Sequence, residues 1–161
     1  MKIEKKTAVA FTGHRQERIT TDRNNLFAKL YHTVSELYAQ GYTTYLTGMA
    51  QGFDLLAAEA VWQFRNDNHA DIRLIAVIPF SRQAGRFSPE DKHRYYRIGQ
   101  VAECVVLSEN YYTGCFHKRN DYLIENASVI VAYYDGIPQG GTYYTANKAY
   151  QMNKEIINLF K

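Results

Sequence analysis

The sequence has few cysteines, no long apolar run and no strong excess of either charge, and each shortage argues against a class of protein. Only 2 cysteines occur in 161 residues, without a metal-type pairing such as CxxC, so we expect no metal site. Cys104 lies within an apolar run, which predicts a buried free thiol in a cytoplasmic protein. The N-terminal apolar run is too short for a signal peptide or a membrane span, and no other segment is long enough.

The charge balance and the composition indicate one globular domain. The formal net charge of +3 permits an anionic ligand but does not require nucleic acid. The chain is 46% hydrophobic and 22% charged, which is ordinary for globular proteins. Its length suits a single domain over residues 1–161 with one core, and we expect no bound cofactor.

What the sequence does contain is an alternation of short apolar runs and longer amphipathic stretches. Strands are expected over residues 7–13, 42–48, 72–80, 102–108, 128–136 and 155–160. Helices are expected over residues 22–41, 53–67, 88–99, 116–126 and 141–153. This alternation predicts an α/β fold, doubly wound, with a mostly parallel sheet flanked by helices on both faces.

The glycines and arginines gather in the loops that follow the strands. In a parallel sheet these loops all lie at the carboxyl edge, where ligands of such folds bind. The opposite edge has little that is unusual beyond AQG and DNHAD. We therefore expect the functional site at the carboxyl edge.

One of these loops, TGMAQGFD, runs from a strand through spaced glycines into a helix. Gly48 and Gly52 would let backbone N–H groups approach a phosphate at the positive end of the helix dipole. A tight turn that packs the two glycines explains the pattern equally well. Asp54, in the first helical turn, either contacts a ribose hydroxyl or only favours the dipole. The loop has neither GxGxxG nor a P-loop lysine.

A later loop, PQGGTYYT, repeats this logic. Gly140 and Gly141 precede a helix that Thr142 is able to cap, and the three residues form a second potential phosphate cradle. Helix capping after a flexible loop is the plainer interpretation of one such loop. Two such loops at one edge are much less common by chance.

The first strand ends in TGHR, which suits an anion site better than a plain turn. A turn needs Gly13 but gains nothing from His14 and Arg15, whereas an anion site would use all four residues, including Thr12. Arg15 can pair with phosphate through two N–H groups, although a surface arginine is the plainer alternative. His14 either donates to the same anion or packs inside the protein.

Other charged and aromatic residues join this candidate site. Arg82 would add to a basic rim. Arg119 and Asn120 come near the start of a helix, where a charged helix face is the alternative, and we expect Arg119 to stay outside the core. Tyr133 and Tyr134 end a strand, so one ring, assigned to Tyr134, would reach the rim and stack on a ligand while the other packs.

Taken together, these residues make the chain resemble the SLOG superfamily, Rossmann-like domains related to the DNA-processing protein DprA and to the "lonely guy" cytokinin-activating enzymes. It is most similar to the YspA/YpsA-like branch. The matching motifs, between Val9 and Ala149, are FTGHR, TGMAQGFDLLAAEA, IPF, KRNDYLIENASVIVAYYDG and GGTYYT. The resemblance implies a Rossmann-like domain that binds a nucleotide or a nucleotide-derived ligand, and some members sense cyclic ADP-ribose signals.

The enzymatic relatives carry an arginine–lysine pair and a PGGxGTxxE loop, and their arginine and glutamate serve hydrolysis of the N-glycosidic bond of a nucleoside monophosphate. In this chain the arginine maps onto Arg119, but Asn120 takes the place of the lysine and Thr145 that of the glutamate. A threonine cannot provide carboxylate acid–base chemistry, so the resemblance disfavours catalysis. Asp54 or Asp135 would have to substitute, and the spacing favours neither.

Three functions remain as alternatives. The first is binding of a small phosphorylated nucleotide derivative, such as ADP-ribose, cyclic ADP-ribose or a nucleoside monophosphate, by a sensor or sequestering protein. The second is an N-glycosidase or phosphoribohydrolase that acts on nucleoside monophosphates. The third is single-stranded DNA binding, which the modest charge disfavours. We favour the first, without enzymatic activity, and expect a homo-oligomer that engages neither nucleic acid nor a membrane.

Overall fold

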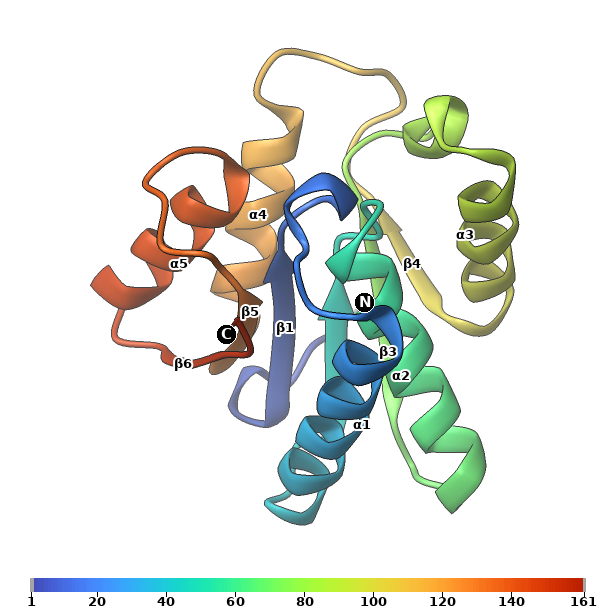
Figure 1. The fold of residues 1–161 in the computed structure, drawn as a ribbon, viewed down its shortest axis with the longest axis vertical. Helices are drawn as coiled ribbons and strands as arrows, with labels where there is room; N and C mark the ends of the chain where they lie inside the picture. Colours follow the sequence, from blue (N-terminus) through green and yellow to red (C-terminus); the bar gives the residue numbers. More distant parts are fainter. Residues whose placement is uncertain (1, 161) are drawn as a thin grey trace.

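All strands of the sheet run in the same direction. The computed structural model describes residues 2–160. The strands are β1 (Ala8–Gly13), β2 (Thr44–Thr47), β3 (Arg73–Ile78), β4 (Glu103–Val106), β5 (Val129–Tyr133) and β6 (Glu155–Asn158). They form one six-stranded sheet in the order β4-β3-β2-β1-β5-β6, and every neighbouring pair is parallel (Figure 1). The predicted parallel sheet is confirmed.

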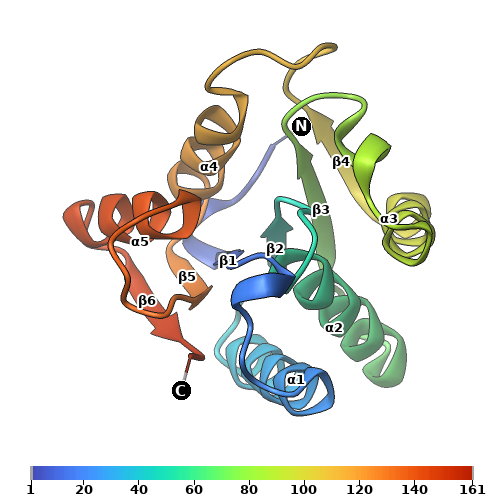
Figure 2. The same ribbon diagram turned by 45° about the horizontal axis from the view of Figure 1, so that its top comes forward.

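Helices cover both faces of the sheet (Figure 2). They are α1 (Arg23–Ala39), α2 (Phe53–Asn68), α3 (Pro89–Val101), α4 (Cys115–Glu125) and α5 (Gly141–Gln151). Helices α1, α2 and α3 contribute to the larger apolar cluster on one face, and α4 and α5 to the smaller cluster on the other. The neighbouring strands β1 and β5 therefore lead into helices on opposite faces. This is a topological switch point, where ligands of such sheets bind.

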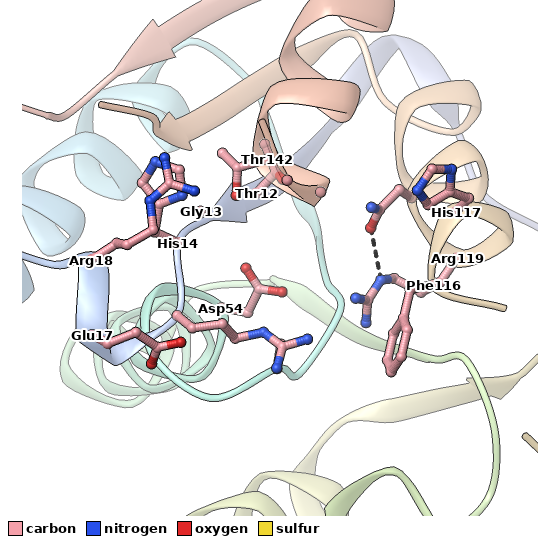
Figure 3. A pocket seen from close by; sticks show the side chains of 15 residues that line it. Thr12, Gly13, His14, Glu17, Arg18, Asp54, Phe116, His117, Arg119 and Thr142 are labelled. Atoms are coloured by element: carbon pink, nitrogen blue, oxygen red, sulfur yellow. Dashed lines mark hydrogen bonds between the residues drawn. The ribbon is translucent and has the colours of Figure 1, made fainter. Parts of the chain in front are cut away.

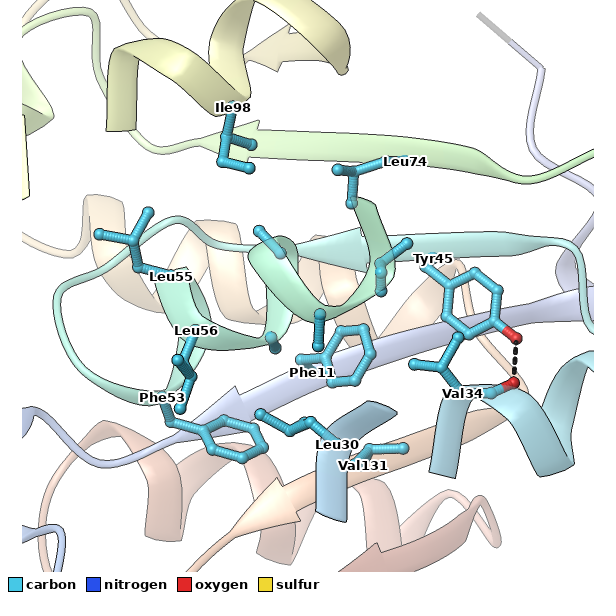
Figure 4. Close-up of a cluster of buried hydrophobic side chains, with 14 of the residues drawn as sticks. Phe11, Leu30, Val34, Tyr45, Phe53, Leu55, Leu56, Leu74, Ile98 and Val131 are labelled. Carbon is cyan, nitrogen blue, oxygen red and sulfur yellow. Dashed lines mark hydrogen bonds between the residues drawn. The ribbon is translucent and has the colours of Figure 1, made fainter. Parts of the chain in front are cut away.

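The central strands are buried on both faces, which explains their nearly continuous apolar runs. In β1, Phe11 points into the larger cluster, whereas Ala10 belongs to the smaller cluster beneath α4 and α5. The ring of Phe11 lies 6.2 Å from that of Tyr45 and 6.4 Å from that of Phe53 (Figure 4). This aromatic packing holds the end of β1 against the first residue of α2, and both segments carry site residues.

The helices begin at the carboxyl edge with two kinds of N-terminus. In α1 and α3 the side chains of Asp22 and Ser88 accept hydrogen bonds from backbone N–H groups within the helix, both at 3.2 Å. Helices α2 and α5 instead follow Gly52 and Gly140, which have φ of 91° and 95° and provide no side-chain cap. The expectation that Thr142 caps α5 is wrong, because Gly140 holds the capping position and Thr142 lies inside the first turn.

The expectation of a buried thiol at Cys104 is also wrong. Cys104 is exposed, because β4 lies at the edge of the sheet and, within residues 2–160, pairs with β3 alone. The buried thiol is that of Cys115, the first residue of α4. Within residues 2–160, none of the helices has the length and apolarity needed to cross a membrane.

Candidate functional site

A pocket of about 410 Å³ lies at the carboxyl edge, and we call it the carboxyl-edge pocket (Figure 3). Its walls come from the loop after β1 and from the starts of α2, α4 and α5. Its volume falls in the range of small-molecule sites. The predicted residues that line it are Thr12, Gly13, His14, Arg15, Asp54, Arg119, Asn120, Gly140, Gly141 and Thr142. The lining residues that the sequence did not single out are Glu17, Arg18, Ala50, Phe116 and His117.

The other predicted site residues are not part of this lining. Arg82 is exposed, and Tyr134 is partly exposed while Tyr133 is buried, which is the expected division of the tyrosine pair. Thr145 is buried in α5, where its Oγ1 donates to the carbonyl oxygen of Gly141 at 2.9 Å. Thr145, which the resemblance matches to the glutamate of the enzymatic relatives, therefore has a hydroxyl that bonds within its own helix.

Arg119 is buried beneath the pocket, with 4% of its surface exposed, so the expectation that it stays outside the core is wrong. Its Nη1 donates to the carbonyl oxygen of Gly48 at 2.6 Å, and its Nε donates to Oδ1 of Asn120 at 2.9 Å. A Cβ at Gly48 would lie 2.6 Å from Nη1 of Arg119. Gly48 is therefore a glycine because the Arg119 side chain occupies the space beside it, and not because a ligand does.

The space beside Gly52 is also filled, in this case by backbone atoms. Its φ is 91°, and a Cβ there would lie 2.7 Å from the carbonyl oxygen of His14 and 2.8 Å from the backbone nitrogen of Gln16. The backbone N–H of Phe53 donates to the same oxygen of His14 at 3.2 Å. The start of α2 is thus fastened to the loop after β1, which supports the tight-turn interpretation of the TGMAQG loop.

The space beside Gly140 and Gly141 is less crowded than that beside Gly48 and Gly52. A Cβ at Gly140 would lie 3.4 Å from Nη1 of Arg18, and one at Gly141 would lie 3.5 Å from Nδ2 of Asn120. Both contacts are to the ends of side chains, and both glycines line the pocket. The N–H groups at the start of α5 therefore face the pocket without a side-chain cap, an arrangement that binds anions in many proteins.

His14 packs inside the protein rather than standing free. Its Nε2 accepts a hydrogen bond from the backbone N–H of Asp135 at 3.0 Å. Burial lowers the pKa of His14, the nearby positive charge of Arg18 lowers it further, and together they outweigh the Asp135 carboxylate, which lies 3.1 Å from Nε2 and raises it. Arg18 pairs with the Asp135 carboxylate through two nitrogens, with Nη2 2.7 Å from Oδ1 and Nε 3.1 Å from Oδ2. This pair ties the loop after β1 to the loop before α5.

Asp54 lies in the first turn of α2 with its carboxylate directed into the pocket (Figure 3). Only 5% of its surface is exposed, and its Oδ1 has no hydrogen-bond partner among the described residues. Burial raises the pKa of Asp54 to about 6, although the charges of Arg119 and Arg15 oppose this rise. The backbone N–H groups of Ala50 and Gly13 also oppose this rise by hydrogen bonding to the carboxylate, so the acceptor left without a partner is the single oxygen Oδ1.

Phe116 lies between two of the three arginines that line the pocket, Arg15 and Arg119. Its ring centre is 5.8 Å from the guanidinium carbon of Arg15 and 5.7 Å from that of Arg119, which are cation–π distances. Phe80 and Tyr111 pack against the same ring. Nothing in the spacing of the sequence marked Phe116, because its neighbours come from separate loops.

The parallel doubly wound sheet and a polar pocket at its switch point place the chain among the Rossmann-like α/β domains. Within that class, the chain belongs to the YspA SLOG family, whose model matches residues 9–159. The family resemblance seen in the sequence is confirmed.

The chain is also similar to two curated proteins and to a solved structure. The chain is 29% identical over 126 residues to the "uncharacterized SPbeta prophage-derived protein YoqJ" of Bacillus subtilis (strain 168), covering 70% of this chain and 73% of YoqJ. It is 23% identical over 108 residues to the UPF0398 protein ABC2016 of Shouchella clausii, covering 65% of this chain and 57% of that protein. The X-ray structure of TM1055 covers 93% of this chain with a TM-score of 0.59 and 18% identity, a likeness of fold.

Proposed function

We propose that the protein binds a small phosphorylated nucleotide derivative in the carboxyl-edge pocket and acts as a sensor or a sequestering protein. The observation that carries the proposal is the state of Arg119. This buried guanidinium donates to a carbonyl and to an amide oxygen, and among residues 2–160 no carboxylate lies within 4.0 Å of it. The carboxylate of Asp54 is near enough to interact with the Arg119 charge but forms no ion pair with it, so this buried charge is only partly compensated. A partly compensated buried charge is costly, and an anionic ligand would supply a direct counterion.

The start of α5 supports a phosphate as this anion. Its uncapped N–H groups carry the positive end of the helix dipole and face the same pocket as Arg119. Arg15 adds a second guanidinium from the loop after β1. Arginine pairs with phosphate through two parallel N–H···O bonds, which suits this combination of donors.

The remaining lining supports a nucleotide rather than free phosphate. A pocket of about 410 Å³ is far larger than a phosphate, and the rings of Phe116 and His117 form part of its wall. Aromatic faces stack on nucleobases. The hydroxyl of Thr145, buried where the enzymes carry glutamate, supports binding rather than turnover.

The first test removes the exposed arginine. In calorimetric titrations with AMP and ADP-ribose, Arg15→Ala should weaken binding by about tenfold to a hundredfold, because a charge-assisted pair contributes roughly 1.5–3 kcal/mol. Arg15→Lys should restore only part of the affinity, since lysine lacks the planar fork. Arg82→Ala, which removes an exposed arginine outside the pocket, is the matched control and should change affinity less than about twofold.

A complementary experiment identifies the ligand. Native mass spectrometry of protein purified from cells should reveal a retained mass of a phosphorylated nucleotide derivative. If no such mass is retained and neither AMP nor ADP-ribose binds at millimolar concentration, nucleotide binding is wrong. Equal losses for Arg15→Ala and Arg82→Ala would place the anion outside this pocket.

Asp54 supports a second candidate function, hydrolysis of the N-glycosidic bond of a nucleoside monophosphate. A buried carboxylate whose pKa is raised to about 6 is suited to act as a general base on water near neutral pH. Asp54 would take a proton from water as the water oxygen bonds to the anomeric carbon and the N-glycosidic bond breaks. The leaving nucleobase would take up a proton, giving ribose 5-phosphate and the free nucleobase. Release of adenine from AMP, lost in Asp54→Asn, would favour this function over simple binding.

A further inference from the structure

The carboxyl-edge pocket contains two features that a ligand could satisfy, a positively charged wall and a carboxylate oxygen without a hydrogen-bond partner within residues 2–160. One wall carries positive charge from Arg15, Arg119 and the start of α5. The carboxylate oxygen is Oδ1 of Asp54, which is buried. The two are close enough for the arginine charges to affect the carboxylate, yet no ion pair within 4.0 Å joins Asp54 to either arginine.

A ligand that is only an anion would pair with the positive wall but would destabilise the Asp54 carboxylate. A phosphate oxygen is an acceptor, as is Oδ1 of Asp54, so the two would repel each other in a desolvated space. An ammonium group would suit Asp54 but would be repelled by the arginines beside it. The group that fits is a neutral donor attached to an anion. A sugar hydroxyl on a phosphorylated ligand has this chemistry.

We propose that Asp54 accepts a hydrogen bond from a ribose hydroxyl, so that the carboxyl-edge pocket selects ribonucleotides over their deoxyribose analogues. This inference rests on the proposed function, since it assumes that a nucleotide occupies the pocket. Its basis is the direction of the Asp54 side chain into the pocket, its burial and its unpartnered oxygen (Figure 3). A site built to bond a hydroxyl strongly rejects an analogue without it, because its own polar group is then left unpaired.

The experiment compares AMP, 2′-deoxy-AMP and 3′-deoxy-AMP by calorimetric titration. In the unaltered protein at least one deoxy analogue should bind at least tenfold more weakly than AMP. In Asp54→Ala the ratio of affinities should fall to within about threefold, because the hydroxyl no longer has its acceptor. The ratio is the informative quantity, since removing a negative charge also changes phosphate binding, and that change affects all three nucleotides alike.

Two further variants serve as controls in this experiment. Asp71→Ala removes one carboxylate from the opposite edge of the sheet and should leave the ratio unchanged. Asp54→Asn preserves shape and an acceptor oxygen without the charge, so a smaller but measurable ratio is expected there, and it serves if the alanine variant does not fold.

The possible results distinguish a failure of the ribose contact from a failure of nucleotide binding. If AMP binds and all three nucleotides bind within threefold, the ribose inference is wrong while nucleotide binding stands. The same holds if a deoxy analogue binds weakly but the ratio is unchanged in Asp54→Ala. If neither AMP nor ADP-ribose binds and the purified protein retains no phosphorylated nucleotide derivative, both proposals are wrong.

Discussion

The two glycine-bearing loops at the carboxyl edge look alike in sequence but differ in structure. In the loop between β2 and α2, Gly48 and Gly52 are closed by the Arg119 side chain and by the backbone of residues 14–16. In the loop between β5 and α5, Gly140 and Gly141 have only the ends of flexible side chains nearby and line the pocket. The first loop is packed against the protein, and the second is open to a ligand.

A glycine before a helix can therefore have either of two structural roles. At Gly52 the missing side chain lets two segments of the protein approach each other. At Gly141 it leaves space beside a helix N-terminus that an anion could enter. In the first loop the group that faces the pocket is therefore a side chain, Asp54, and not the backbone.

A methyl group added to each loop tests how tightly the two loops are packed. Gly52→Ala and Gly140→Ala both impose positive φ on alanine, a strain of about 1–3 kcal/mol. Gly52→Ala also forces Cβ against backbone at 2.7 Å, so it should cost roughly 2 kcal/mol more free energy of unfolding than Gly140→Ala. Urea unfolding followed by circular dichroism measures both. Equal losses would show that the first loop is no more tightly packed than the second.

The next prediction concerns the carboxylate at the end of the packed loop. Burial raises the pKa of Asp54 to about 6 from 3.8, so its contribution to stability is present at pH below 3.8 and is lost as pH rises through about 6. Without ligand, Asp54→Asn should therefore be more stable than the unaltered protein at pH 7.5, by about 2 to 3 kcal/mol, and the gap should shrink towards pH 4. Urea unfolding at both pH values tests this, and a gap independent of pH would contradict it.

The smallest effect on the fold is expected in the open loop. Gly141→Val should lower AMP affinity at least tenfold, about 1.4 kcal/mol, because its side chain would crowd the start of α5. Its Cβ meets Nδ2 of Asn120 only at 3.5 Å, so the melting temperature should change little. Thermal melts beside titrations separate the two effects. A large loss of stability with unchanged affinity would mean that this loop, too, is structural.

Much of the site was predictable from the sequence, and the failures have physical causes. Thr12 to Arg15, Asp54 and Gly140 to Thr142 were assigned to the correct edge, because each segment ends or follows a strand in the chain. Arg18 was missed because its partner Asp135 is 117 positions away, and nothing local to Arg18 marks the pairing. Arg119 was placed outside the core because helix periodicity does not reveal a cavity that opens beneath the helix start.

The parallel sheet, the covering helices and the edge at which the polar residues gather could all be predicted from the amino-acid sequence. These follow from properties of neighbouring residues, namely apolar runs, helical spacing and the handedness of strand–helix–strand connections. The folded arrangement was needed to show which glycines are open, that Arg119 is buried and that, among residues 2–160, Oδ1 of Asp54 has no partner. Those facts depend on contacts between segments far apart in the chain, such as Gly48 with Arg119, and no local pattern encodes such contacts.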